Sequence, residues 1–156
     1  AEWPFTGGVR PPGVTSCGPE SGRLVAYHAV RAMITGDVAT VERTYASSVV
    51  LHDLLSQSYR GLAAVRELAL LFSGALWDAT VSLHFCVSGD GLVTARWSAE
   101  GTHAGVLLGA APTMRPAVVN GVSMLRVENG RVVEQWNDYL DFHPSRHRAP
   151  VMTALA

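Results

Sequence analysis

The sequence contains no lysine, only two cysteines and no apolar run long enough to cross a membrane. All 12 cationic side chains are arginines spread along the chain, and the formal net charge is −1, so a nucleic-acid or anionic-membrane partner is disfavoured. Cys17 and Cys86 support neither a disulfide framework nor a cysteine-based zinc site. The first residues also lack a basic segment followed by an apolar one. We therefore expect a reduced, cytoplasmic protein.

The composition indicates one globular domain with an arm and a tail. At 156 residues and 48% hydrophobic content, the chain is long enough to bury a core without disulfides or metals. Prolines and glycines dominate residues 1–20 and predict an irregular arm, followed by a single domain over 21–143 and a tail over 144–156. His143 and His147 have i,i+4 spacing, but Pro144 and neighbouring arginines indicate a solvated tail, so we expect no metal.

Helical spacing recurs in the first half of the domain. Apolar positions from residue 21 predict a helix that Gly36 ends, and Asp37 is placed to cap a second short helix that reaches Tyr45. A β-branched run over 48–53 predicts a strand. After Gly61, the spacing predicts a third helix.

From residue 77 the period changes to two, which predicts strands. The pattern indicates two hairpins, 77–88 with 92–102 and 117–127 with 131–142. Their connections, Gly89-Asp90-Gly91 and Glu128-Asn129-Gly130, suit tight turns with positive backbone angles. Early helices followed by a long antiparallel sheet predict an α+β domain in which the helices close one face of the sheet over a pocket.

Alternation within the strands divides residues between a pocket face and an outer face. We expect Arg96 and Ser98 on one strand, and Trp136 and Asp138 on another, to point into the pocket. The opposite face of the predicted strand 92–102 is apolar enough to form a homodimer contact. Its residues are Val93, Ala95, Trp97 and Ala99.

Several motifs resemble the SnoaL-like polyketide cyclases, within the nuclear-transport-factor-2-like (cystatin-like) cone fold. The similarity covers roughly residues 24 to 142. The motifs are Thr35-Gly36-Asp37, Val50-Leu51-His52-Asp53, Gly61-x-x-Ala64-Val65, Gly101-Thr102-His103-x-Gly105, Leu108-Gly109 and Pro112-Thr113. The resemblance implies a curved antiparallel sheet packed on three helices around an apolar pocket.

The segment from Trp136 to Asp141 resembles limonene epoxide hydrolase, a relative with an Asp, Arg, Asp constellation. That similarity implies catalytic roles for Arg96 and Asp138. Ser98 stands where the hydrolase has its second Asp, and Asp53 stands where it has an Asn, so paired-carboxylate water activation is disfavoured. His52 and Asp53 end the first predicted strand, where the family places polar pocket groups, although a strand-terminal cap is an equally simple role.

Further residues are candidates for substrate contact. Tyr27 shares a helix face with Val30 and Ile34, so core packing and a hydroxyl aimed at the pocket are both open. His84 alternates with apolar residues, and His103 is expected to brace the long loop. The loop from His103 to Pro116 suits a partly mobile flap over an apolar ligand. The substrate-contact candidates are Tyr27, His84, Ser98, Trp136, Leu107 and Met114.

These features favour a cofactor-independent cyclase or isomerase of secondary metabolism, such as antibiotic biosynthesis. It would act on a hydrophobic, polyketide-like small molecule as a homodimer. Asp138 would be the general acid/base, oriented by Arg96, because one carboxylate can remove a proton α to a carbonyl and return it to the developing alkoxide. Two alternatives stay open. One is a limonene-type epoxide hydrolase or epoxide-opening cyclase, and the other is a non-catalytic ligand-binding module.

Overall fold

The protein is described by a computed structural model over residues 15–16, 21–53 and 57–144. Most of the predicted arm and nearly all of the predicted tail therefore lie outside the described residues. Three helices and one curved sheet form an α+β fold, which confirms the predicted class and element order. Within these ranges, no helix has the length and apolar character needed to span a membrane.

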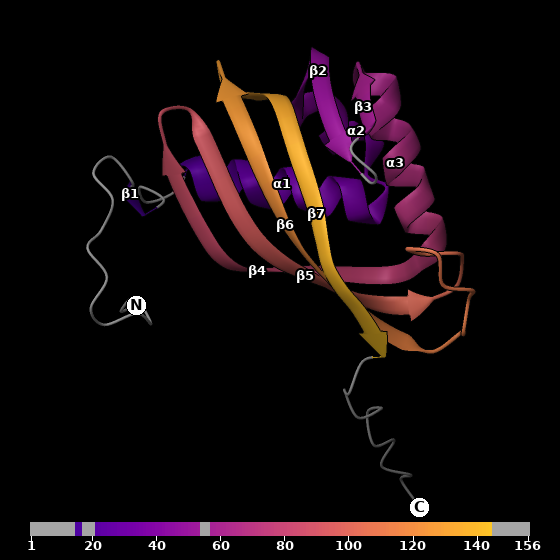
Figure 1. Ribbon diagram of the computed structural model, residues 1–156. Helices are drawn as coiled ribbons and strands as arrows, with labels where there is room; N and C mark the ends of the chain where they lie inside the picture. The colour runs from indigo at the N-terminus through magenta and orange to yellow at the C-terminus, as the bar shows by residue number, and fades with distance from the viewer. Residues whose placement is uncertain (1–14, 17–20, 54–56, 145–156) are drawn as a thin grey trace, which may run out of the picture.

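Seven strands form the sheet, in the order β1-β4-β5-β6-β7-β2-β3 (Figure 1). Neighbours are antiparallel except β2 and β7, which run parallel. The strands are β1 (Thr15–Ser16), β2 (Tyr45–Asp53), β3 (Gln57–Arg60), β4 (Leu76–Gly89), β5 (Leu92–His103), β6 (Pro116–Glu128) and β7 (Arg131–Pro144). The patterns did not predict β1 or β3. They also placed Tyr45 in a helix, whereas it begins β2.

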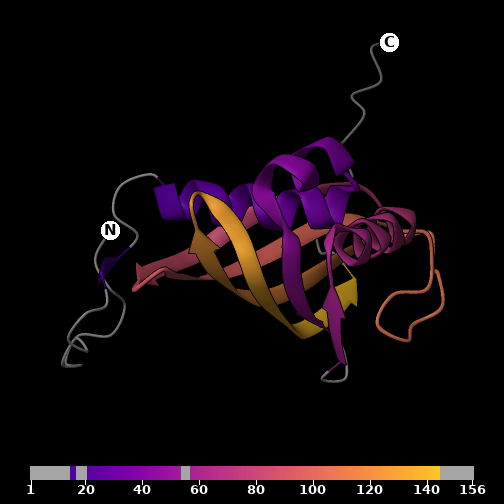
Figure 2. The same cartoon turned by 90° about the horizontal axis from the view of Figure 1, so that it is seen from above.

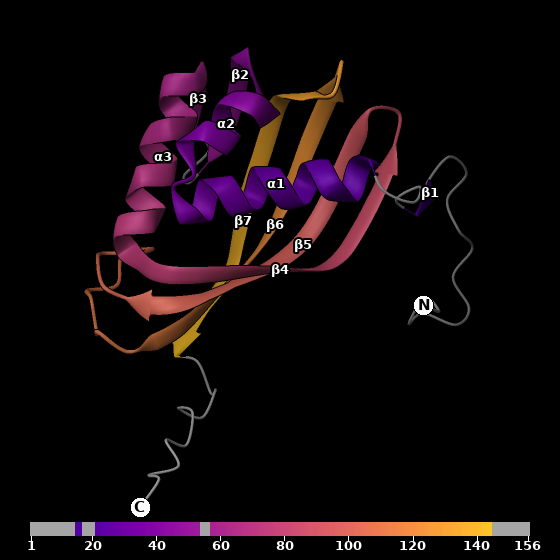
Figure 3. The same ribbon diagram turned by 180° about the vertical axis from the view of Figure 1, so that it is seen from behind.

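The helices are α1 (Ser21–Thr35), α2 (Val38–Thr44) and α3 (Leu62–Ala75). They gather on one side of the curved sheet (Figure 2). α1 lies across this face and contacts β4, β5, β6 and β7 (Figure 3). We call the helix-covered side of the sheet the inner face and the opposite side the outer face.

Local sequence fixes the two hairpins. Asp90 and Gly91, and likewise Asn129 and Gly130, have positive φ angles at successive positions. Such a pair of left-handed residues matches the twist of adjoining strands, which explains why Asp-Gly and Asn-Gly stand there. Both predicted hairpins are confirmed.

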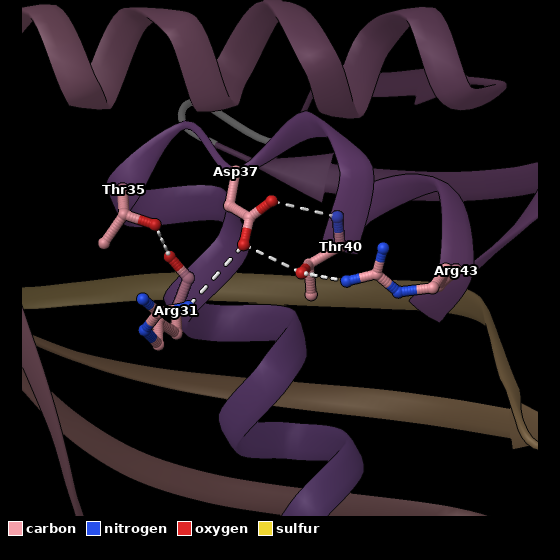
Figure 4. Close-up of polar contacts among 5 residues, drawn as sticks. All are labelled: Arg31, Thr35, Asp37, Thr40 and Arg43. Atoms are coloured by element: carbon pink, nitrogen blue, oxygen red, sulfur yellow. Dashed lines mark hydrogen bonds and ion pairs between the residues drawn. The ribbon is translucent and has the colours of Figure 1, made fainter.

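The corner between α1 and α2 is closed by a side-chain cap (Figure 4). Asp37 accepts hydrogen bonds from the backbone N–H of Thr40 at 3.1 Å and from its hydroxyl at 2.8 Å, while Arg31 lies 3.6 Å away. The two hydrogen bonds from Thr40, helped by the arginines nearby, hold the pKa of Asp37 below its ordinary value. The predicted capping role of Asp37 is therefore confirmed.

The two faces of β5 are the reverse of the expected ones. Val93, Ala95, Trp97 and Ala99 are buried on the inner face, with Trp97 fully inaccessible. They pack into the apolar core against the helices. The prediction that these four residues form a dimer contact is wrong, because burying their apolar surface inside one chain already removes it from water.

A β-bulge in β7 explains the second reversal. The turn pairs Glu128 with Arg131 and Val127 with Val132, and an unbroken ladder would then place Trp136 opposite Ser123, on the inner face. Instead one extra residue enters β7 after Val132, and Trp136 pairs with Met124. This one-residue slip moves the side chains that follow to the other face, up to a second register shift between Tyr139 and Asp141. Asp138 is consequently exposed on the outer face.

Candidate active site

Asp53 is the one predicted catalytic residue that the structure places on the inner face. It ends β2, is 5% exposed, and its Oδ2 accepts hydrogen bonds from Asn137 Nδ2 at 2.7 Å and from the Tyr139 hydroxyl at 2.9 Å. Burial disfavours a charged carboxyl group, whereas two hydrogen-bond donors favour it. Asp53 Oδ2 thus has two hydrogen-bond donors although the side chain is buried.

The partners of Asp53 come from the strand next to it. β2 runs parallel to β7, with His52 opposite Trp136, so Asn137 and Tyr139 follow directly beyond on the inner face. Both are half-buried. The bulge in β7 brings this amide and this phenol, rather than Trp136 and Asp138, to the carboxylate.

The polar groups extend away from Asp53 into the core. Asn137 Oδ1 accepts from Ser123 Oγ at 2.7 Å and from Gln135 Nε2 at 2.7 Å. Ser123 accepts from Trp97 Nε1 at 3.0 Å, and Gln135 Oε1 accepts from the Tyr45 hydroxyl at 2.7 Å. Tyr45, Trp97, Ser123 and Gln135 are each fully buried. We call these four residues with Asn137, Tyr139 and Asp53 the inner network.

Two tyrosines of the inner network are held neutral. Burial, the Asp53 charge and the hydrogen bond to that carboxyl group raise the pKa of Tyr139 well above its ordinary value. Burial is also the main cause that raises the pKa of Tyr45. Tyr139 consequently remains an O–H donor at every pH near neutrality.

Apolar side chains surround the inner network. Tyr139 contacts the ring of Phe72 at 5.5 Å between centroids and the indole of Trp97 edge-on at 6.1 Å. The sulfur of Met33 lies 3.5 Å from Asn137 Nδ2 and 3.7 Å from Gln135 Nε2. In such surroundings charges and dipoles act on one another more strongly than in water.

Arg96 and Asp138 lie on the outer face, and both are exposed. Each pairs with Val122 of the intervening strand, so two strand spacings, roughly 10 Å, separate their backbones. No ion pair joins the two side chains in the described part of the chain. The expectation that they share an inward-facing pocket is wrong, for the reasons of burial and register given above.

His52 and Trp136 also lie on the outer face and contact each other. Their rings stack at 5.1 Å with an interplanar angle of 9°. His52 Nε2 lies 2.8 Å from Glu134 Oε1, and Arg126 Nε donates to Glu134 Oε2 at 3.4 Å. The hydrogen bond from His52, supported by Arg126, lowers the pKa of Glu134. His52 and Asp53 therefore point to opposite faces, as consecutive strand residues must.

The remaining residues predicted to contact the substrate lie in different parts of the molecule. His84 is exposed, and its Nε2 lies 2.7 Å from the hydroxyl of Ser98 on the outer face. Tyr27 is half-buried on α1 with its ring beside His28. Leu107 is buried in the core, whereas Met114 is 58% exposed.

The loop after β5 is fastened at several points. Ala104 and Gly105 donate backbone N–H groups to Ala75, and Met114 N–H donates to His103. His103 Nδ1 lies 3.2 Å from Thr113 Oγ1 and its ring meets Phe142 edge-on, so it braces the loop as expected. Its Nε2 is buried without a partner. Mobility of this loop as a flap stays a prediction.

No cluster of three or more metal-ligating side chains occurs in the ranges that the structure describes. The chemistry that the inner network offers is that of its own groups. Asp53 supplies a proton acceptor, and Asn137 and Tyr139 supply donors at its edge.

Asn137 and Tyr139 were not predicted as site residues. Both lie within the segment from Trp136 to Asp141, in which the resemblance assigned the pocket roles to Trp136 and Asp138 instead. Leu125 is apolar and points to the inner face. Because Leu125 pairs with Gln135 once the extra residue in β7 is included, Gln135 and Asn137 also point to the inner face.

The fold and the buried carboxylate on the inner face define a small α+β protein with a polar site between sheet and helices. The family model of the SnoaL-like polyketide cyclases matches residues 24–143. The chain therefore belongs to the SnoaL-like polyketide cyclase family, and cyclase or isomerase chemistry is the activity that this family indicates. No curated protein matches.

Solved structures share the fold. IdmH from Streptomyces antibioticus is 25% identical, with a TM-score of 0.63 over 77% of this chain and 92% of its own. TsrD from Streptomyces laurentii is 18% identical, with a TM-score of 0.66 over 78% and 90% of the two chains. A SnoaL-like polyketide cyclase from Agrobacterium tumefaciens is 11% identical, with a TM-score of 0.64 over 77% and 91%.

Proposed function

We propose that this protein is a cofactor-independent cyclase or isomerase that uses Asp53 as its general acid/base. The observation that carries the proposal is the buried Asp53 carboxylate held between Asn137 and Tyr139 among apolar side chains. Family membership supports a hydrophobic, polyketide-like substrate bound in an apolar pocket next to this carboxylate. Asp53 thus takes the role that the sequence assigned to Asp138.

The proposed reaction balances with one carboxylate. Asp53 removes a proton from a carbon α to a carbonyl group, and the enolate carbon attacks a second carbonyl carbon of the same substrate. The new alkoxide then takes the proton back from Asp53, so the product is an isomer. Tyr139, kept neutral by its raised pKa, donates a hydrogen bond that stabilises negative charge as it moves between Asp53 and the substrate.

Product analysis in heavy-oxygen water tests the proposal. The protein is incubated with linear polyketo esters, and products are examined by mass spectrometry. A cyclised isomer without the oxygen label supports the proposed function. An epoxide substrate that gains labelled water identifies the hydrolase alternative, and saturable binding with every ligand recovered unchanged identifies the non-catalytic alternative.

We also propose that a second copy of the chain covers the outer face. Apolar side chains are interspersed there with Arg96 and Asp138, which carry opposite charges and lie on the two sides of Val122. A two-fold axis near Val122 would place Arg96 of each copy near Asp138 of the other. The apolar residues of the outer face include Phe85, Val118, Val122, Met124 and Trp136.

A further inference from the structure

The inner network has a direction that is set at its two ends. An indole N–H is only a donor, so Trp97 Nε1 must donate to Ser123 Oγ, and the Ser123 proton is then available for Asn137 Oδ1. At the other end an ionised carboxylate is only an acceptor, so Asn137 must turn its Nδ2 toward Asp53. The carboxylate end requires this orientation of the Asn137 amide, and the available Ser123 proton favours the same one.

A second branch imposes that orientation again. The Tyr45 hydroxyl lies 2.7 Å from Gln135 Oε1 and 3.2 Å from the carbonyl oxygen of Ala29; through the shorter bond it donates to Gln135, whose Nε2 then faces Asn137 Oδ1 at 2.7 Å. Asn137 Oδ1 therefore receives two donors, one from β6 and one from its own strand. If the amide were reversed, its NH₂ group would face the Gln135 NH₂, and its oxygen would face Asp53 Oδ2. Donors would meet donors and acceptors would meet acceptors, each away from water.

We infer that Ser123 and Gln135 are positioning residues that lock the Asn137 amide as a hydrogen-bond donor to Asp53. Both donate to Asn137 Oδ1, and both are fully buried. Hydrogen bonds to a buried carboxylate are short and strong because the acceptor is charged. The lock thus keeps Asp53 aimed from β2 toward β7. The consequence for turnover rests on the proposed function, whereas the orientation of the amide does not.

Two variants test the lock in the whole chain. Ser123→Ala removes one donor to Asn137 Oδ1, and Gln135→Met removes the other with little change in side-chain length. Ser82→Ala is the matched control, since Ser82 is exposed on the outer face of β4. Nuclear magnetic resonance follows the two Nδ2 protons of Asn137 without substrate. In the wild type one of them should lie downfield and exchange slowly, because it is held by a carboxylate.

We expect the downfield shift and the slow exchange to be reduced in each variant, reduced further in the double variant and retained in Ser82→Ala. With a substrate, kcat should fall about 10- to 100-fold in each variant while KM changes little, since a small misplacement of a catalytic group is costly. Ser123→Cys, which keeps a weak donor, should recover part of both signals.

The outcomes separate the inference from the proposed function. Asn137 amide signals that match the wild type in folded Ser123→Ala and Gln135→Met would overturn the lock, even if Asp53→Asn were inactive. A lost amide signal in a protein that turns over no substrate would support the lock while contradicting the proposed function. Should Ser123→Ala fail to fold, Ser123→Cys and Gln135→Met give the same comparison.

Discussion

At the scale of single residues, the inner network ties two phenols to the stability of the fold. Burial raises the pKa of both Tyr45 and Tyr139 above the ordinary value near 10. Below that pH the phenols are neutral in the folded and unfolded chains alike. Above it the unfolded chain loses protons that the folded chain keeps, so stability must fall as pH rises.

Alkaline unfolding measures this effect with little interference, because the chain has no lysine to titrate in the same range. We expect the free energy of unfolding to decrease between about pH 9 and pH 11, the interval around the ordinary pKa of tyrosine. The decrease should be smaller in Tyr45→Phe and in Tyr139→Phe. Urea unfolding at several pH values checks the prediction, and an identical decrease in all three proteins would contradict it.

At the scale of elements, β5 packs against β6 where Gly121, which has no side chain, leaves room for an indole ring. Trp97 pairs with Gly121, and a Cβ at Gly121 would overlap the indole ring. The indole lies flat enough over β6 to donate to Ser123, two residues along. The small residue at 121 therefore positions the first donor of the inner network.

Gly121→Ala should destabilise the protein by about 1–3 kcal/mol, the usual cost of overpacking a core. Gly74→Ala is a suitable control, because Gly74 lies in α3 with open space around its Cβ position. Alanine in a helix should leave stability unchanged or raise it by about 0.5–1 kcal/mol. Thermal and urea unfolding compare the two, and equal stability of Gly121→Ala and wild type would argue that Trp97 moves freely.

At the scale of the whole molecule, the proposed dimer contact and the proposed active site lie on opposite faces of the sheet. Half-buried apolar side chains on the outer face surround Val122, with Arg96 and Asp138 on its two sides. Covering such a surface with a second copy removes it from water and pairs the charges. Catalysis stays on the inner face in this account, and assembly uses the outer one.

Val122→Lys should weaken dimerisation by about 100-fold or more, because it would bury an unpaired charge at the proposed contact. Leu70→Lys is the matched control, since Leu70 is 61% exposed on α3, away from the outer face. Sedimentation at micromolar concentration should find dimers for wild type and Leu70→Lys and monomers for Val122→Lys. A monomeric wild type would refute the proposed contact.

Local signals in the sequence were sufficient for the helices, the hairpins and the end of β2 at Asp53. Turn residues such as Asn129 and Gly130 act through their own backbone angles, so their outcome needs no knowledge of the rest of the chain. The facing of Trp136 and Asp138 depends on one extra residue in β7. No local sequence preference predicts that bulge, because it depends on how β6, β7 and β2 pack together. The bulge determines which side chains of β7 lie next to Asp53.

A comparison of the turnover of Asp53→Asn with that of Asp138→Asn tests whether Asp53 is the general acid/base. Each substitution keeps the shape of the side chain and removes a carboxylate, one on the inner face and one on the outer. We expect kcat of Asp53→Asn to fall by about 100-fold or more, the loss expected for a general acid/base, with KM largely kept. Asp138→Asn should match the wild type. The reverse pattern, with an inactive Asp138→Asn and an active Asp53→Asn, would contradict it.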